Sequence, residues 1–167
     1  MLIQDFSLQP THNSIVLYTS RASYGNSIGW NEETIRQGFF WSVKCFGFCI
    51  FEGGYHLQVK VYRDNKIPNL MPETKRGILV PFQIEQSQSL TITDLWNDVH
   101  ILISEGKYGL LFELGTVLDS VDEAIDADAE YDQWCRLTFI PGEISEAQIL
   151  RKDSEISPTY PLIMGLD

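Results

Sequence analysis

A chain of 167 residues has the usual size of one domain and can bury a core without disulfides or a structural metal. Its 23 acidic and 12 basic residues give a net charge of −11, and this negative field repels phosphate backbones, which argues against direct nucleic-acid binding. No run approaches the roughly 18 apolar residues of a membrane span and no basic leader is present, so we expect a cytoplasmic protein.

The first predicted elements are a strand and a short helix. Residues 14–19 are rich in β-branched and aromatic side chains, which is typical of a strand. Asn31 is a favourable N-cap, acidic residues follow it in the first turn, and Gly38 can adopt the left-handed conformation that ends a helix. We also expect Trp30 to pack on Ile35 as a hydrophobic staple.

Further apolar segments predict a series of short strands. With the first strand, they cover residues 14–19, 39–51, 55–63, 77–85, 90–92, 99–103, 108–114 and 134–140. Glu52-Gly53-Gly54 predicts a hairpin between the second and third segments, and Glu105-Gly106 predicts another between the sixth and seventh. Pro81 cannot donate a hydrogen bond to a neighbouring strand and is therefore expected at a sheet edge or a bulge. Residues 94–98 are expected to form a single helical turn.

The spacing of these segments predicts a mainly β fold. We expect an antiparallel β-sandwich or an open barrel with one short helix near residues 32–37. Residues 1–142 are expected to form this domain. Residues 143–167 are richer in Glu, Ser, Lys and Pro, and we expect an arm that packs on the domain or is partly disordered.

The cysteines and histidines show no catalytic or metal-binding pattern. A zinc site would have to combine Cys45, Cys49 and Cys135 with a histidine, but Cys45 and Cys49 lie in an apolar strand and are expected to pack in the core. The three histidines form no recognisable dyad, and the sequence has no nucleophile elbow and no phosphate-binding glycine loop. We therefore expect no cofactor, no bound metal and no enzymatic activity.

The most distinctive charge feature is an acidic run from Glu113 to Asp132 that contains no Lys or Arg. Because like charges repel, the run is expected to be an exposed, solvated loop or a docking surface for a basic protein. The candidate partner-binding residues are Asp119, Asp122, Glu123, Asp126, Asp128 and Glu130. A calcium site is a third alternative, although the central glycine and the final glutamate of an EF-hand loop are missing.

A pattern around the predicted helix is similar to that of a known family. Trp30, Glu33, Ile35, Gly38 and Phe39 form a Trp-x-x-Glu-x-Ile-x-x-Gly-aromatic stretch after the first strand. This stretch resembles the ComJ family, also called Nin or competence protein J. The similarity continues through the Val-Pro-Phe segment of the fourth strand and a Gly-Lys-Tyr turn, and it extends over roughly residues 10 to 140.

The resemblance implies a protein inhibitor that binds a DNA-entry nuclease and spares the DNA of the cell. Such a nuclease presents a cationic groove to DNA, and an acidic protein can occupy that groove through the same electrostatic attraction. The alternative function is a β-sandwich module for a small molecule or a carbohydrate, with Trp41, Trp96 and Trp134 as its binding platform. Tryptophans in apolar strands are, however, more often core residues.

Overall fold

The computed structural model describes the chain except residues 20–28, 43, 54–55, 86–87, 118–131 and 166–167. The strands are β1 (Leu2–Leu8), β2 (Ser14–Tyr18), β3 (Phe39–Ser42), β4 (Cys45–Cys49), β5 (Leu57–Arg63), β6 (Arg76–Ile84), β7 (Gln88–Thr93), β8 (Asp98–Ile103), β9 (Gly106–Thr116), β10 (Gln133–Pro141) and β11 (Gln148–Arg151). Helix α2 spans Glu32–Gln37. The helix in the described part of the chain is too short to cross a membrane.

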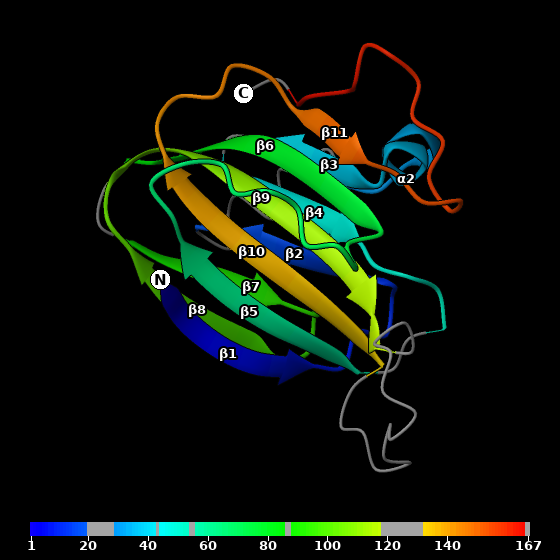
Figure 1. Cartoon of the computed structure of the whole chain (residues 1–167), viewed down its shortest axis with the longest axis horizontal. Helices are drawn as coiled ribbons and strands as arrows, with labels where there is room; N and C mark the ends of the chain where they lie inside the picture. The colour runs from blue at the N-terminus through cyan, green and yellow to red at the C-terminus, as the bar shows by residue number, and fades with distance from the viewer. Residues whose placement is uncertain (20–28, 43, 54–55, 86–87, 118–131, 166–167) are drawn as a thin grey trace.

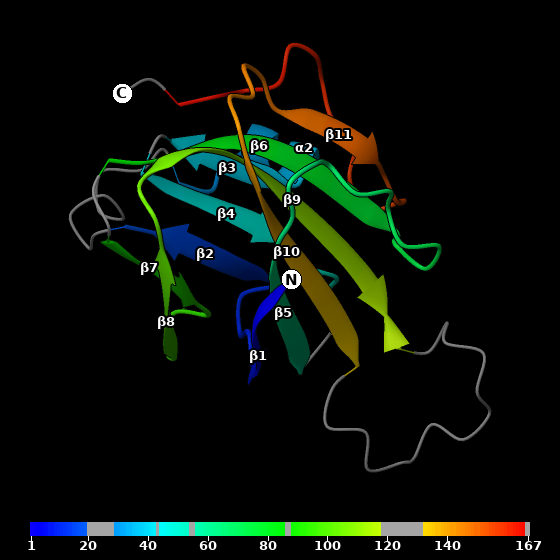
Figure 2. The same ribbon diagram turned by 60° about the vertical axis from the view of Figure 1, so that its left-hand side comes forward.

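The strands form two sheets that face each other. One sheet has the order β1-β5-β10-β9-β6-β11 and the other has the order β3-β4-β2-β7-β8. Figures 1 and 2 show the two sheets as separate layers. The prediction of a mainly β sandwich with one short helix is confirmed, with one difference: β5 and β10 run parallel, whereas the other described pairs are antiparallel.

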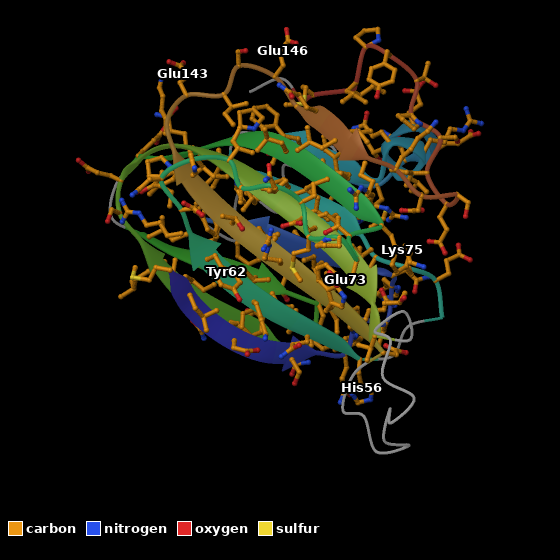
Figure 3. The ribbon with its side chains drawn as sticks, in the orientation of Figure 1. His56, Tyr62, Glu73, Lys75, Glu143 and Glu146 are labelled. Carbon is orange, nitrogen blue, oxygen red and sulfur yellow. The ribbon has the colours of Figure 1, made fainter. Side chains whose placement is uncertain are left out.

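The core lies between the sheets. Along β5, Leu57, Val59 and Val61 are fully buried and alternate with partly exposed residues, as the sequence pattern predicts. Figure 3 shows Tyr62 on the outward side of this strand. Across the core, the ring of Phe48 on β4 stacks on Phe112 of β9, with 4.4 Å between the ring centroids. Aromatic packing of this kind joins the two sheets.

Helix α2 begins and ends at the predicted residues. The side chain of Asn31 accepts hydrogen bonds from the backbone N–H groups of Glu33 and Thr34, and the hydroxyl of Thr34 accepts one from Asn31 N–H. This reciprocal pair is a capping box, which satisfies N–H groups that have no partner within the helix. Gly38 ends the helix at φ 85, where a side chain would cause strain.

Trp30, which precedes the helix, packs on a strand residue. Its ring packs edge-on against Phe40 of β3, with 4.8 Å between the centroids. Ile35 is 53% exposed and lines the same pocket as Trp30. The Trp30–Phe40 contact joins the entry of the helix to β3, and the packing of Trp30 on Ile35 stays a prediction.

Both predicted hairpins are wrong. β4 and β5 lie in different sheets, so the chain passes from one sheet to the other between Cys49 and Leu57. β8 and β9 also lie in different sheets, with residues 104–105 between them. A glycine permits the chain to reverse sharply, but hydrogen bonding between strands decides which strands become neighbours in a sheet. The almost wholly buried β9 pairs with β10 on one side and β6 on the other, which leaves no place for β8.

Other local predictions also need correction. The apolar run at 39–51 is not one strand, because β3 and β4 within it form an antiparallel pair. Residues 94–97 form the turn between β7 and β8 and are not helical. Strand β1 was not predicted, because only Leu8 of this strand is buried. Pro81 lies beyond the part of β6 that pairs with β11, so its missing N–H faces a free strand edge, as expected.

The C-terminal segment lies against the sandwich. β11 pairs with β6, and Asp153 forms an ion pair with the buried Arg76. Ile156 is buried beside Gly38, and the backbone N–H of Ile163 donates a hydrogen bond to the side chain of Gln37. Figure 1 shows this segment next to α2 and β3, on the far side of the sandwich from β1.

Candidate protein-binding surface

Four connections between strands meet at one end of the sandwich. Their described residues are 9–13, 50–53, 56, 94–97, 117 and 132. The residue pairs at this end of the six-stranded sheet are Leu8–Leu57, Leu57–Gln133 and Gln133–Thr116. In the five-stranded sheet, β2 begins beside the end of β4, and the turn between β7 and β8 lies next to them. In Figure 1, β1 and β9 end and β5 and β10 begin at the lower right.

The same four connections contain no Lys or Arg, although the chain has 12 such residues. They do contain carboxylates, among them Glu52, Asp94 and Asp132. β6 also begins here, where the exposed Lys75 precedes it. The guanidinium of Arg76 is buried and paired with Asp153. We call the region formed by the four connections the acidic end.

Two acidic residues at the opposite end of the sandwich are paired with lysines. Glu85 is paired with Lys44 at 3.3 Å, and Glu143 is paired with Lys107 at 2.8 Å. Figure 3 shows Glu143 at the top of the molecule and His56, which belongs to the acidic end, at the bottom. The described residues of the four connections contain no Lys or Arg, whereas these two acids at the opposite end are paired with lysines.

Hydrogen bonds join the connections of the acidic end into one framework. They run from Gln9 N–H to Asp94 Oδ2 (3.0 Å), from Trp96 Nε1 to Thr11 Oγ1 (3.0 Å), from Ile50 N–H to Asn13 O (2.9 Å), from Phe51 N–H to Gln133 Oε1 (3.0 Å) and from His56 N–H to Asp132 Oδ1 (3.2 Å). Four of these bonds join two different connections, and the bond to Gln133 joins a connection to the start of β10, so the described residues at this end support one another.

Asp94 organises the turn between β7 and β8. It is 1% exposed, and its Oδ1 atom accepts hydrogen bonds from the backbone N–H groups of Trp96 and Asn97. Burial opposes ionisation of this carboxyl, but the hydrogen bonds from Asn97, Trp96 and Gln9 outweigh burial and lower its pKa. Asp94 therefore remains a carboxylate that fixes the turn.

The turn that Asp94 holds presents two large apolar side chains to solvent. Leu95 is 41% exposed and Trp96 is 75% exposed. The backbone of Leu95 has φ 83, a left-handed conformation that is a true outlier for a bulky side chain. The sequence analysis named Trp96 only as part of a carbohydrate platform and did not name Leu95, although the Asp-Leu-Trp-Asn composition between two strands is compatible with a tight turn.

The predicted partner-binding acids cannot be placed. Asp119, Asp122, Glu123, Asp126, Asp128 and Glu130 lie outside the described residues. The chain leaves β9 and returns to β10 where Val117 N–H donates a hydrogen bond to Asp132 O at 3.0 Å, so both ends of this segment belong to the acidic end.

Glu113 does not belong to an exposed acidic surface, which corrects the predicted start of the acidic run. It is fully buried in β9 and paired with Arg136 of β10. Its Oε1 atom also accepts hydrogen bonds from Met71 N–H and Thr74 Oγ1, both at 2.8 Å. Strand alternation directs this carboxylate beneath the 69–74 segment, where Arg136 neutralises its charge.

The cysteines are packed at separate places. Cys45 and Cys135 are buried, in different sheets, as the core prediction expects. Cys49 is partly exposed, and burial raises its pKa to about 11, an effect that the nearby charge of Arg76 only partly offsets. Among the described residues, no group of three His, Cys, Asp or Glu side chains could hold a metal ion.

A pocket of about 300 Å³ lies next to the acidic end and is lined by Trp30, Cys49, Glu52, Arg76 and Glu155, among others. The guanidinium of Arg76 is already hydrogen-bonded within the chain. It donates to both carboxylate oxygens of Asp153 and to the carbonyl of Cys49. The pocket therefore presents no unpaired arginine to a ligand.

The three tryptophans of the alternative function lie in three different places. Trp41 donates a hydrogen bond to Pro81 O at 2.7 Å and packs against the core. The ring of Trp134 packs on Gly115 so closely that a Cβ atom at this glycine would lie 2.3 Å from the ring. Trp96 lies in the turn of the acidic end. They do not form one platform for a ring-shaped ligand.

Comparison with known proteins identifies a family and a fold. The family described as Competence protein J (ComJ) matches residues 8–140. The structure is similar to that of ComJ from Bacillus subtilis, an inhibitor of the DNA degrading activity of NucA, with a TM-score of 0.66, 12% identity and coverage of 85% of this chain and 98% of that chain. A structure described as Crocagin biosynthetic gene J gives a TM-score of 0.50, 16% identity and coverage of 83% and 96%. No curated protein matches the sequence.

Proposed function

Because the chain belongs to the ComJ family, we propose that it is a protein inhibitor of a DNA-degrading nuclease and has no catalytic activity of its own. The inhibitor covers the cationic groove in which the nuclease binds DNA. One observation supports this mode of action more than any other: the described residues of four connections, none of them Lys or Arg, meet at one end of the sandwich, the acidic end.

Electrostatics explains how such an end competes with DNA. A nuclease that cuts DNA without sequence preference must attract phosphates with Lys and Arg side chains. The acidic end attracts the same side chains, and its net charge steers the two proteins together over a screening length of about 8 Å at physiological ionic strength. The proposed contacts are made by Asp119, Asp122, Glu123, Asp126, Asp128 and Glu130, within the cytoplasm.

The first experiment measures inhibition. The purified chain is added in micromolar excess to the nuclease encoded beside its gene, and DNA cleavage is followed at low salt. We expect cleavage to stop and the two proteins to co-purify. Unchanged cleavage without complex formation would overturn the proposed function.

The second experiment tests the acidic end. Asp122, Glu123, Asp126 and Asp128 are replaced together by Asn or Gln, and association with the nuclease is measured at several salt concentrations. We expect slower association with a weaker salt dependence, since charges at the rim of an interface act mainly on the on-rate. The matched control replaces Glu143 and Glu146, at the opposite end, and should leave association almost unchanged. Equal effects of both sets would contradict the assignment of the acidic end.

The alternative function, a binding module for a small molecule or a carbohydrate, receives less support. A sugar-binding platform needs aromatic rings that share one face. The positions of Trp41, Trp96 and Trp134 do not meet this requirement.

A further inference from the structure

We infer that Leu95 and Trp96 form the apolar anchor of the inhibitor, and that Trp96 enters an apolar recess of the nuclease bordered by cationic side chains. This inference rests on the proposed function and adds residues that the acidic run does not contain. Tryptophan is among the residues that contribute most to protein interfaces, because it buries a large area while losing little conformational freedom. Trp96 is 75% exposed, so most of this area is available to a partner.

Backbone strain at Leu95 supports the assignment. A bulky side chain at φ 83 costs free energy that glycine would avoid. The Leu95 side chain gains little within the chain in return, since it is 41% exposed. Strain of this kind persists where a side chain serves a function other than the stability of the fold.

The turn is also held ready for binding. Asp94 accepts hydrogen bonds on both oxygens, from Trp96, Asn97 and Gln9, and Trp96 Nε1 donates to Thr11. A side chain that is fixed before association loses less entropy when the complex forms. The turn therefore presents a rigid apolar contact and not a flexible one.

The surroundings of the turn identify the partner. The described residues of the four connections at this end include the exposed Glu52 and no Lys or Arg, and the exposed Asp98 follows the turn directly. A partner surface that fits must bring cations to these carboxylates and an apolar recess to Trp96. A nuclease groove rimmed with Lys and Arg has this combination, whereas an anionic membrane surface or DNA would be repelled.

Two variants and one control test the inference on the full chain by binding to the nuclease encoded beside its gene. Trp96→Ala should weaken binding by at least about 30-fold, the size expected of a central interface residue. The loss should appear in a faster off-rate. The control, Leu102→Ala, removes an even more exposed side chain from β8 of the same hairpin, where it pairs opposite Ser89, away from the turn. It should leave binding unchanged.

Leu95→Gly separates binding from folding. Glycine accepts the left-handed backbone, so the thermal midpoint should stay the same or rise, while binding should weaken by about 5-fold or more. A purely structural role of Leu95 predicts no loss of binding in a variant of equal stability. If Trp96→Ala lowers the thermal midpoint, this glycine variant still decides the question.

The outcomes distinguish the two proposals. If the wild-type chain neither binds nor inhibits the nuclease, both proposals fail. If the wild type inhibits and both turn variants bind as well as Leu102→Ala, the anchor is wrong and the proposed function stands. If the turn variants change the off-rate and the acidic variants change the on-rate, both are supported.

Discussion

The guanidinium of Arg76 at the start of β6 forms a bidentate ion pair with the carboxylate of Asp153, at 2.6 Å from Nε and 2.8 Å from Nη2. Arg76 is 1% exposed, and its remaining partners are the Cys49 carbonyl and, at 3.5 Å, Glu155. The pair connects the six-stranded sheet to a segment that lies beyond residues 8–140, the range matched by the family.

Breaking this pair should destabilise the fold. We expect Asp153→Asn to lower the free energy of unfolding by about 3 kcal/mol, because a buried guanidinium would lose the charge that neutralises it. The matched control is Glu143→Gln, which breaks a solvent-exposed pair with Lys107 and should cost less than about 1 kcal/mol. Chemical denaturation measures both. Equal costs for the two variants would show that the Arg76–Asp153 pair does not stabilise the sheet.

The pair between Glu113 and Arg136 gives a prediction about a double variant. Arg136→Met should cost about 3 kcal/mol, since it leaves a fully buried carboxylate without its cation. Adding Glu113→Gln removes that charge, while the amide oxygen can still accept the hydrogen bonds from Met71 and Thr74. We therefore expect the double variant to be more stable than Arg136→Met alone in urea unfolding. The opposite order would mean that buried charge is not the source of the cost.

Asp94 gives a pH dependence of known sign. Its pKa in the folded chain is lower than its ordinary value of 3.8, so folding favours the carboxylate. The corresponding stability is present above pH 3.8 and is lost as the pH falls through the lower, folded-state pKa. Asp94→Asn lacks this contribution and places an NH₂ group against the N–H donors of the turn.

We therefore expect Asp94→Asn to be less stable than the wild type by about 2 kcal/mol at neutral pH, the cost of unsatisfied buried groups. The difference should shrink as the pH falls below 3.8. Thermal unfolding at a series of pH values measures this difference and cancels contributions common to both proteins, such as that of Asp153. A difference that does not change with pH would exclude ionisation of Asp94 as its source.

The thiols should react slowly in the folded protein. The pKa of Cys49 is raised to about 11, so less thiolate is present at pH 8 than for a thiol at the ordinary value of 9.0. Cys45 and Cys135 are buried and should be protected until the chain unfolds. Alkylation followed by mass spectrometry should show at most slow modification of Cys49 in the native state and three modified thiols after denaturation. Rapid native modification of Cys135 would contradict its position in the core.

Local features of the fold could be predicted because they depend on neighbours in the sequence. The helix cap at Asn31, the helix end at Gly38 and the alternation along β5 are set by backbone conformation and by the two-residue period of a strand. Pairing between strands could not be predicted in the same way. Gly53 and Gly106 both permit reversal, yet the strands on either side of each enter different sheets.

The sequence by itself determined the fold class, the short helix, the family pattern and the excess of acidic charge, because these follow from local conformation and composition. Only the tertiary structure decided which charges act together. It buried Glu113 beside Arg136 and brought the described residues of four distant connections, none of them Lys or Arg, to one end. It also exposed Trp96 on a strained turn, where sequence reasoning expected a helical turn. These outcomes depend on pairing between residues far apart in the chain, which no local pattern specifies.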